Sequence, residues 1–231
     1  MLPLALSGPD EGRENGLPVH ILEDDILLSQ HLDFAARKLV SSDSFGPFDI
    51  VFTETFIQPN IYWLAFYKQE FDRALAGGRE AIRFQVKDLK AQHWWGMTSY
   101  FVAAASIDKV LRILAEELER GPTMPIDDCL LRAAREGRLK IGCWFPFVTS
   151  IMLDCITAST IPGREKQVGN PSIMLHALLR YSFFVDRDLE GYARPFLEAL
   201  VGDESEKPVD VHRDFIVKLL ERIVAGRYRL Y

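Results

Sequence analysis

The chain has 231 residues, of which 48% are hydrophobic, which is enough to bury the core of one domain with a small appendage. Its formal net charge of −6 argues against a dedicated nucleic-acid-binding protein, because such proteins gain much of their affinity from basic residues on phosphates. No apolar run reaches membrane-spanning length, and the N-terminal segment lacks the basic residues of a secretory signal, so we expect a soluble, cytoplasmic protein.

The first predicted element is a strand at Val19–Leu22, an apolar run typical of the middle of a parallel or mixed sheet. Three acids follow this strand, and apolar residues then recur near helical spacing from Ile26 to Val40. The next apolar run, Phe48–Phe52, predicts a second strand, whose sequence again leads into an acid, Glu54. Strand, helix and strand together predict a right-handed crossover, so we expect Phe48–Phe52 to lie parallel beside an interior strand at Val19–Leu22.

The middle of the chain predicts two further strands and a clear helix. The first part of segment 79–95 alternates like a strand, and Thr98–Ala104 is a second buried strand, with Gly96 as the break between them. Ser106 is a good N-cap for the amphipathic helix that follows, and Gly121 closes that helix.

The remaining elements complete a mixed α/β sheet and add a helical tail. Another helix starts within 122–137 after a loop that begins with proline, and 138–148 follows as a strand. Beyond Ile161 the pattern becomes helical, with Asn170 as an N-cap before a proline. We therefore divide the chain into an α/β domain over 1–162 and a helical extension over 163–231.

The three cysteines, Cys129, Cys143 and Cys155, indicate neither a disulfide framework nor a zinc site. Their number is odd, and none of them lies in a CxxC spacing. We expect buried thiols in a reducing compartment.

The three acids Glu23, Asp24 and Asp25 have two interpretations. Acids at a turn from strand to helix can cap the helix and lie favourably near the positive end of its dipole. Alternatively, they lie at the carboxyl end of a sheet strand, where open α/β folds bind ligands, and alternation puts Glu23 and Asp25 on one side. Carboxylates in such a position suit a hard divalent ion that also binds the phosphates of a substrate.

The segment "GLPVHILEDDILL" resembles the core of glycosyltransferase family 25, whose members include bacterial lipooligosaccharide galactosyltransferases. The family signature is an apolar strand followed by Leu-Glu-Asp-Asp. Four further segments are similar in order and spacing: "FDIVFTET", "WGMTSYFVAAASIDKVLRIL", "MPIDDCLL" and "STI". The resemblance covers residues 16–161 and implies a GT-A-like mixed sheet with flanking helices, a UDP-sugar donor and Mn²⁺ or Mg²⁺.

The resemblance also implies roles for individual residues. Glu23 and Asp25 become the metal ligands. We place Asp24, Trp95 and Gly96 among the residues that contact the nucleotide sugar. Asp127 and Asp128 match a position where the family has a carboxylate near the acceptor, which could accept the proton of the attacking hydroxyl, although helix capping explains them equally well.

Two departures from the family qualify this expectation. The family's first strand, which reads Ile-Asn-Leu-Asp, and its Gly-Cys-x-x-Ser-His segment are both missing before Val19, so we expect an N-terminally truncated version of the fold.

Our first hypothesis is a metal-dependent transferase of a hexose, most plausibly galactose, onto a glycan or glycolipid in lipopolysaccharide biosynthesis. The alternative is a catalytically inactive relative that serves as a binding or structural module. No nucleic-acid partner is expected, whereas peripheral contact with a membrane is compatible with a glycolipid acceptor.

Several other residues carry weaker signals. Trp94 and Trp95 could stack on a sugar ring or base, although core packing is the better explanation for at least one of them. His93 is a candidate because it adjoins this pair. Arg164 and Lys166 could approach a diphosphate from a loop, although a solvated loop is the simpler explanation.

Overall fold

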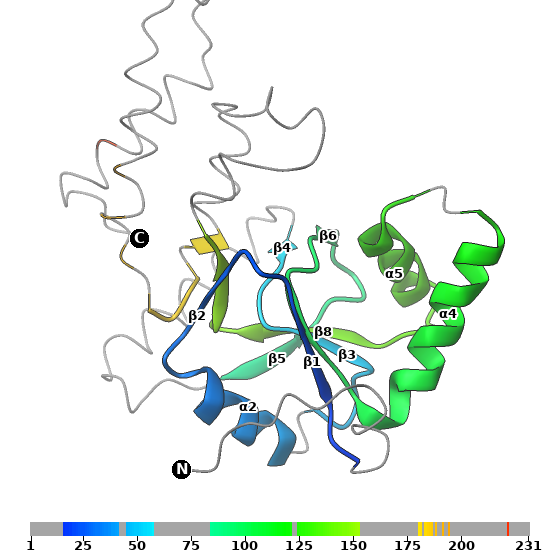
Figure 1. Ribbon diagram of the computed structural model, residues 1–231, viewed down its shortest axis with the longest axis horizontal. Coiled ribbons are helices and arrows are strands. Elements are labelled where there is room, and N and C mark those ends of the chain that lie inside the picture. The colour runs from blue at the N-terminus through cyan, green and yellow to red at the C-terminus, as the bar shows by residue number, and fades with distance from the viewer. Residues whose placement is uncertain are drawn as a thin grey trace, which may run out of the picture. The chain divides into compact units, whose positions relative to one another are not determined.

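The computed structural model describes residues 16–41, 45–57, 84–121 and 124–152, together with a few single positions between 180 and 221. The chain divides into two compact units, Met1–Thr149 and Ser150–Tyr231. The first unit is a mixed α/β structure (Figure 1), as the sequence predicted. The predicted boundary after residue 162 and most of the predicted C-terminal helices lie outside the described residues.

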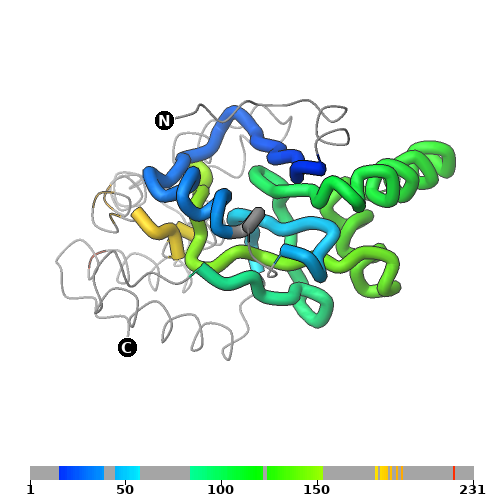
Figure 2. Tube along the Cα trace, turned by 90° about the horizontal axis from the view of Figure 1, so that it is seen from below, coloured from blue at the N-terminus to red at the C-terminus, as the bar shows by residue number. Residues whose placement is uncertain are grey.

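A five-stranded sheet forms the centre of the first unit, in the order β1-β7-β3-β8-β5. Its strands are β1 (Val19–Leu22), β3 (Ile50–Phe52), β5 (Gln85–Asp88), β7 (Ser99–Val102) and β8 (Ile141–Phe145). Strand β7 pairs antiparallel with both β1 and β3, β3 pairs parallel with β8, and β5 pairs antiparallel with β8. Figure 2 shows this order across the sheet, with β1 in dark blue at one edge.

Four short strands of the described residues lie outside the central sheet. Strand β4 (Phe56–Ile57) pairs antiparallel with β6 (Trp94–Trp95), with Phe56 opposite Trp95. Strand β2 is Ile26–Leu28 and β9 is Thr149–Ile151. The predicted break at Gly96 falls between β6 and β7, where its φ of 88° is in the left-handed region that favours glycine.

Three α-helices flank the sheet in the described part of the chain: α2 (Leu32–Ser41), α4 (Ile107–Glu119) and α5 (Ile126–Arg135). Helices α4 and α5 contact each other and lie on the opposite side of the unit from α2 (Figure 1). The predicted helices in the middle of the chain are thereby confirmed, and α4 gives way to Gly121 with a φ of 81°. No helix among the described residues is long and apolar enough to cross a bilayer.

The prediction of an interior β1 beside β3 was wrong. Strand β1 is at the edge of the sheet, and β7 separates it from β3, although β1 and β3 still run in the same direction. The side chains of Ile21 and Leu22 are 39% and 36% exposed, which an interior strand would not allow. The apolar run is explained by partial burial of its first residues at a sheet edge.

The predicted start of the first helix at Ile26 was also wrong. Residues Ile26–Leu28 form β2, and α2 begins only at Leu32. The hydroxyl of Ser29 accepts a hydrogen bond from the amide of His31 at 2.9 Å, and the carbonyl of Ser29 accepts one from the amide of Leu32 at 3.0 Å. These bonds form a turn that separates the strand from the helix.

The core is built from both faces of the central strands. All three residues of β3 and all five of β8 are buried. Cys129 and Cys143 are buried free thiols, as predicted, whereas Cys155 lies outside the described residues. In the second unit, the rings of Tyr181 and Phe184 are 5.7 Å apart and both side chains are buried.

Asp49, which precedes β3, connects the amino end of this strand to α4 through its side chain. Its carboxylate accepts hydrogen bonds from the Ser106 hydroxyl, the Lys109 ammonium and the Lys140 amide, each at 2.7 Å. The Ser106 hydroxyl therefore binds Asp49 and does not cap α4 as predicted. Burial, the largest single influence, favours the neutral acid, but these three donors together outweigh it and lower the pKa of Asp49 below its ordinary value of 3.8.

Replacing Asp49 with alanine should lower the free energy of unfolding by about 2–4 kcal/mol, because Lys109 and two other donors lose their acceptor in a buried position. Urea unfolding at neutral pH measures this loss. Asp33→Ala is the matched control, since Asp33 pairs only with the exposed Arg37 on α2 and should cost about 0.5 kcal/mol or less. An equal loss in both variants would contradict the role of Asp49.

A buried chain of polar side chains crosses the sheet from β1 to the segment after β8. The ring nitrogen Nε2 of His20 lies 3.0 Å from the Ser99 hydroxyl, and the Thr53 hydroxyl donates to that of Ser99. Thr53 also lies 2.8 Å from the Thr149 hydroxyl. The His20 ring stacks on Phe101 with centroids 3.9 Å apart, and burial lowers the pKa of His20 from 6.5 to about 4.

This pKa predicts a pH-dependent stability. Between pH 6.5 and about 4 the folded chain holds His20 neutral while the unfolded chain protonates it, so the free energy of unfolding should fall as the pH drops through this window. The loss should be roughly 2–3 kcal/mol and should vanish in His20→Gln. Urea unfolding at several pH values measures the difference between the two proteins. The same slope in both would show that His20 is not responsible.

Candidate functional site

Polar side chains gather at one edge of the central sheet. Strands β1, β3 and β8 run in the same direction, so their carboxyl ends meet at this edge together with the amino end of the antiparallel β7. The buried polar residues Thr53, Glu54 and Thr55 follow β3, and Thr98 and Ser99 begin β7. Ligands of open α/β sheets bind at the carboxyl ends of strands. This edge is therefore the candidate site.

The predicted acidic turn lies at this edge, directly after β1. The amide of Glu23 donates a hydrogen bond of 2.8 Å to the carbonyl of Thr98, which fixes the start of the turn against β7. Glu23 and Asp24 are exposed, whereas Asp25 is half-buried. One carboxylate oxygen of Asp25, Oδ1, is buried and has no hydrogen-bond partner among the described residues. Such an oxygen is costly to bury, which indicates a cation or donor that binds there.

Glu54 is the acid at this site that our sequence analysis did not include among the site residues. Its side chain is 0% exposed, and one carboxylate oxygen accepts a hydrogen bond from the hydroxyl of Thr98. The next residue, Thr55, donates its hydroxyl to the carbonyls of Trp95 at 3.0 Å and Gly96 at 3.3 Å. The signal that could have revealed Glu54 was its position two residues after a fully apolar strand.

Asp127 approaches the same segment from the first turn of α5. Its Oδ2 accepts a hydrogen bond of 3.0 Å from the amide of Gly96, and its Oδ1 accepts one of 3.0 Å from the amide of Asp128. The second bond satisfies a free amide at the start of α5, as a helix cap does. The first bond is a tertiary contact that capping does not require. The capping interpretation of Asp127 is thus supported, and the bond to the Gly96 amide is a further contact that the sequence did not predict.

The segment 96–98 is the point where these acids meet. It is bonded by the amide of Glu23, by the carboxylate of Glu54 and by the carboxylate of Asp127. These three residues come from distant parts of the sequence. The structure thus brings the acidic turn and the start of α5 to one short segment of chain, which directly follows Trp95.

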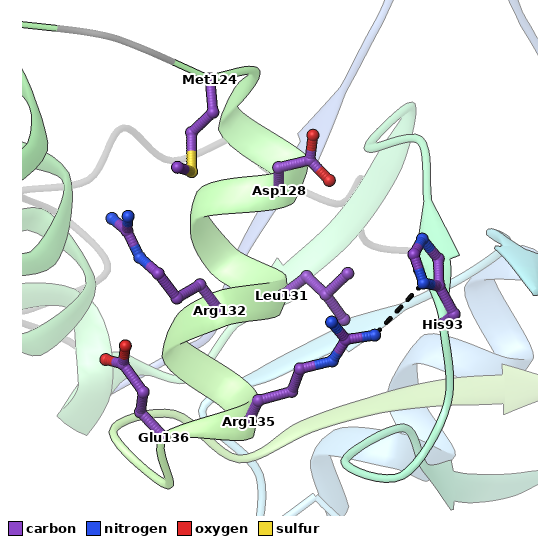
Figure 3. A pocket seen from close by; sticks show the side chains of 7 residues that line it. All are labelled: His93, Met124, Asp128, Leu131, Arg132, Arg135 and Glu136. Atoms are coloured by element: carbon purple, nitrogen blue, oxygen red, sulfur yellow. Dashed lines mark hydrogen bonds between the residues drawn. The ribbon is translucent and has the colours of Figure 1, made fainter.

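Asp128 belongs to a groove over the outer face of α5, with a volume of about 480 Å³. Figure 3 shows the seven residues that line it: His93, Met124, Asp128, Leu131, Arg132, Arg135 and Glu136. Arg135 donates to Nδ1 of His93 at 3.2 Å. The groove volume lies within the roughly 300–1,000 Å³ of sites for small molecules, and its polar residues offer both donors and acceptors.

Trp94 belongs to the core, whereas Trp95 lies beside the candidate site. Trp94 is 0% exposed and packs 4.8 Å from Phe52, so it is a core residue. Trp95 is half-buried and lies between Phe56 and His93, with ring centroids 4.8 and 4.6 Å away. Trp95 is therefore the tryptophan that connects the acidic edge with the groove on α5.

The described acids fit a metal ion only with help from a substrate. No three histidine, cysteine, aspartate or glutamate side chains in the described part of the chain lie close enough to hold a metal ion. Mg²⁺ and Mn²⁺ accept one or two carboxylates when substrate phosphates and water complete the shell. The buried oxygen of Asp25, which has no partner among the described residues, suits such an ion, and Glu23 is the second ligand that the family resemblance implies. Arg164 and Lys166, the candidates for diphosphate contacts, lie outside the described residues.

Comparisons with family models, with curated proteins and with solved structures found no match to this chain.

The contacts of Asp127 and Asp128 predict different effects on stability. Asp127→Ala should lower the free energy of unfolding by about 1–2 kcal/mol, because the amides of Gly96 and Asp128 lose their acceptor. Asp128→Ala is the matched control on the same helix turn. Its exposed carboxylate faces the groove, and its loss should cost about 0.5 kcal/mol or less. Thermal or urea unfolding compares them, and equal effects would contradict the distinction.

Proposed function

We propose that the chain is a metal-dependent glycosyltransferase that moves a hexose, most plausibly galactose, from a UDP-sugar to a hydroxyl of a glycan or lipooligosaccharide-type acceptor. The observation that carries this proposal is the meeting of the acidic turn, Glu54 and Asp127 at segment 96–98. Helix capping alone gives these acids no reason to meet. Their position at the carboxyl edge of the sheet supports a site for a charged, phosphate-bearing donor.

The acidic turn supplies the donor side of this site. Asp25 and Glu23 would hold Mn²⁺ or Mg²⁺, and the ion when bound would neutralise charge on the diphosphate leaving group. Asp24 is exposed at the tip of the turn, where its carboxylate can accept hydrogen bonds from the hydroxyls of the donor. The backbone bond from Glu23 to Thr98 orients the turn toward the segment that carries Trp95 and Gly96.

The two acids of α5 divide the acceptor side between them. Both oxygens of Asp127 already accept hydrogen bonds from amides, so Asp127 is a positioning residue for Gly96 and for the start of α5. Asp128 points into the groove (Figure 3) and accepts no hydrogen bond from the described residues. Its carboxylate is the better general base. It would take the proton of the acceptor hydroxyl as that oxygen bonds to the hexose carbon and the bond to UDP breaks.

Trp95 supports the proposed site because it would lie between the donor side and the acceptor side. Its indole is half-buried and fixed by Phe56 and His93 on its flanks. A fixed aromatic face suits the C–H surface of a sugar ring or the face of a base. The groove beside it offers donors from Arg132 and Arg135 and acceptors from Asp128 and Glu136, a mixture that matches the hydroxyls of a sugar.

The alternative function is that of a binding or structural module without catalysis. Strand β1 is at the sheet edge, and two of the three acids that follow it are exposed. The described residues also provide at most two ligands for a metal ion. These features favour a site that binds its donor weakly, and the experiment below separates the two functions.

UDP with Mn²⁺ should raise the melting temperature of the full chain, because a ligand that binds only the folded state stabilises it. Asp25→Asn should lose this rise while the ligand-free protein keeps or slightly gains stability, since the variant removes the charge of a half-buried carboxylate, one oxygen of which has no partner among the described residues. Asp88→Asn is the matched control, because among the described residues Asp88 binds only the nearby amide of Lys90, so this variant should keep the full rise.

Three results would bear on the proposal. A rise that needs both UDP and Mn²⁺ and disappears in Asp25→Asn supports the donor site. A rise that Asp25→Asn keeps in full removes Asp25 as a ligand. The absence of any rise in the parent protein, with folding confirmed by circular dichroism, favours the module without catalysis.

A further inference from the structure

Helix α4 has a second apolar face in addition to the one that packs on the sheet. The core face consists of Ile107, Val110 and Ile113, which are all buried. The second face consists of Leu111, Leu114, Ala115 and Leu118, at helical spacing i, i+3, i+4 and i+7. Leu111 is 48% exposed and Leu118 is 68% exposed. A helix that only covers its own sheet needs one apolar face, so the second face requires a separate explanation.

Two charged residues flank this second face, and both lack ion-pair partners in the described part of the chain. Arg112 and Glu119 are exposed and lie on the same side of the apolar stripe, two turns apart along the helix. The other acids of α4 behave differently, because Glu116 pairs with Arg138 and Glu117 pairs with Arg132, each at 2.5 Å. Arg112 and Glu119 are thus the charges of α4 that remain available to another molecule.

These residues are arranged almost symmetrically about Ala115. Leu111 and Leu118 lie on either side of it, and Arg112 and Glu119 lie on either side with opposite charges. A two-fold contact between identical surfaces requires such an arrangement, because each group must meet its complement across the axis. The small side chain of Ala115 would lie at the crossing point, where it lets two helices approach closely.

We propose that this face of α4 is a docking surface for a second copy of the chain, with the two α4 helices antiparallel about a two-fold axis near Ala115. In this arrangement Arg112 of one copy lies beside Glu119 of the other, and the pair occurs twice. A parallel two-fold arrangement would instead place Arg112 and Glu119 of the two copies on opposite sides of the helix pair, where they could not meet. Charge complementarity therefore selects both the partner and its direction.

The size of the surface predicts a weak dimer. Helix α4 has 13 residues, so it is only about 20 Å long. One helix pair of this length buries less than the roughly 1,200 Å² that is typical of stable interfaces. We therefore expect association that depends on protein concentration and on salt. The docking surface lies on α4 and does not depend on the proposed transferase activity.

Sedimentation velocity of the full chain over a wide range of concentration tests the proposal directly. The average mass should rise from the monomer mass of 26.4 kDa toward twice that value as the concentration increases. Leu118→Gln should weaken association by roughly tenfold or more, because it appears twice in a two-fold contact. Since Leu118 is 68% exposed, the variant should fold normally. Phe34→Gln is the matched control, as Phe34 is 60% exposed on α2.

A charge exchange tests the antiparallel direction. Arg112→Glu and Glu119→Arg should each weaken the dimer, because each places like charges opposite each other at two positions. The double variant should restore association, since it recreates both pairs with the charges exchanged. A hydrophobic contact with some other protein would not produce this restoration in a purified sample.

A cysteine at the proposed axis provides an independent measurement. Ala115→Cys should form a disulfide between two copies under mild oxidation, because the axis brings residue 115 of each copy together. Ala105→Cys, at an exposed position before α4, should not. A chain that stays monomeric at every concentration overturns the proposal. A dimer that Leu118→Gln leaves intact, or that the double charge variant does not restore, overturns it as well.

Discussion

Strand β7 runs antiparallel between β1 and β3, and the rest of the candidate site depends on this single constraint. Because β7 runs against its neighbours, the segment that leads into it must lie at the edge where β1 and β3 end. The backbone of 96–98 is thereby placed among side chains that follow two other strands. If β1 paired directly with β3, the acidic turn would have no contact with this segment. The hydrogen bond from the Glu23 amide to the Thr98 carbonyl and the one from the Thr98 hydroxyl to the Glu54 carboxylate both follow from this order.

The acids at the two ends of the sheet strands have opposite environments. At one edge, the carboxylate of Asp49 receives three donors, and its charge is compensated within the fold. At the other edge, Glu23 and Asp24 are exposed and Asp25 has a buried oxygen without a partner among the described residues. A fold that needed Asp25 only for stability would satisfy its buried oxygen as it satisfies the carboxylate of Asp49. The contrast supports a functional role for the acidic turn.

The sequence predicted the elements of this unit more reliably than their neighbours in space. Helices α4 and α5 carry strong periodicity and clear end signals, and both form as expected. The position of β1 could not be predicted, because "VHIL" is equally apolar in the interior and at a half-buried edge, and strand order depends on contacts between distant segments. Residues 26–28 are too few for their period to distinguish a strand from the first turn of a helix.

At the candidate site, the positions of single residues could be predicted, but their contacts in space could not. The positions of Asp127 and Asp128 before an amphipathic pattern predict acids in the first turn of a helix, and the structure places them there. Their different roles could not be predicted, because they depend on which of the two faces Gly96. Successive residues on a helix point about 100° apart, so only one of two adjacent acids can bind that amide while the other faces the groove. A pair of adjacent acids thus lets one residue bind the segment after β6 to the start of α5 while its neighbour faces the groove.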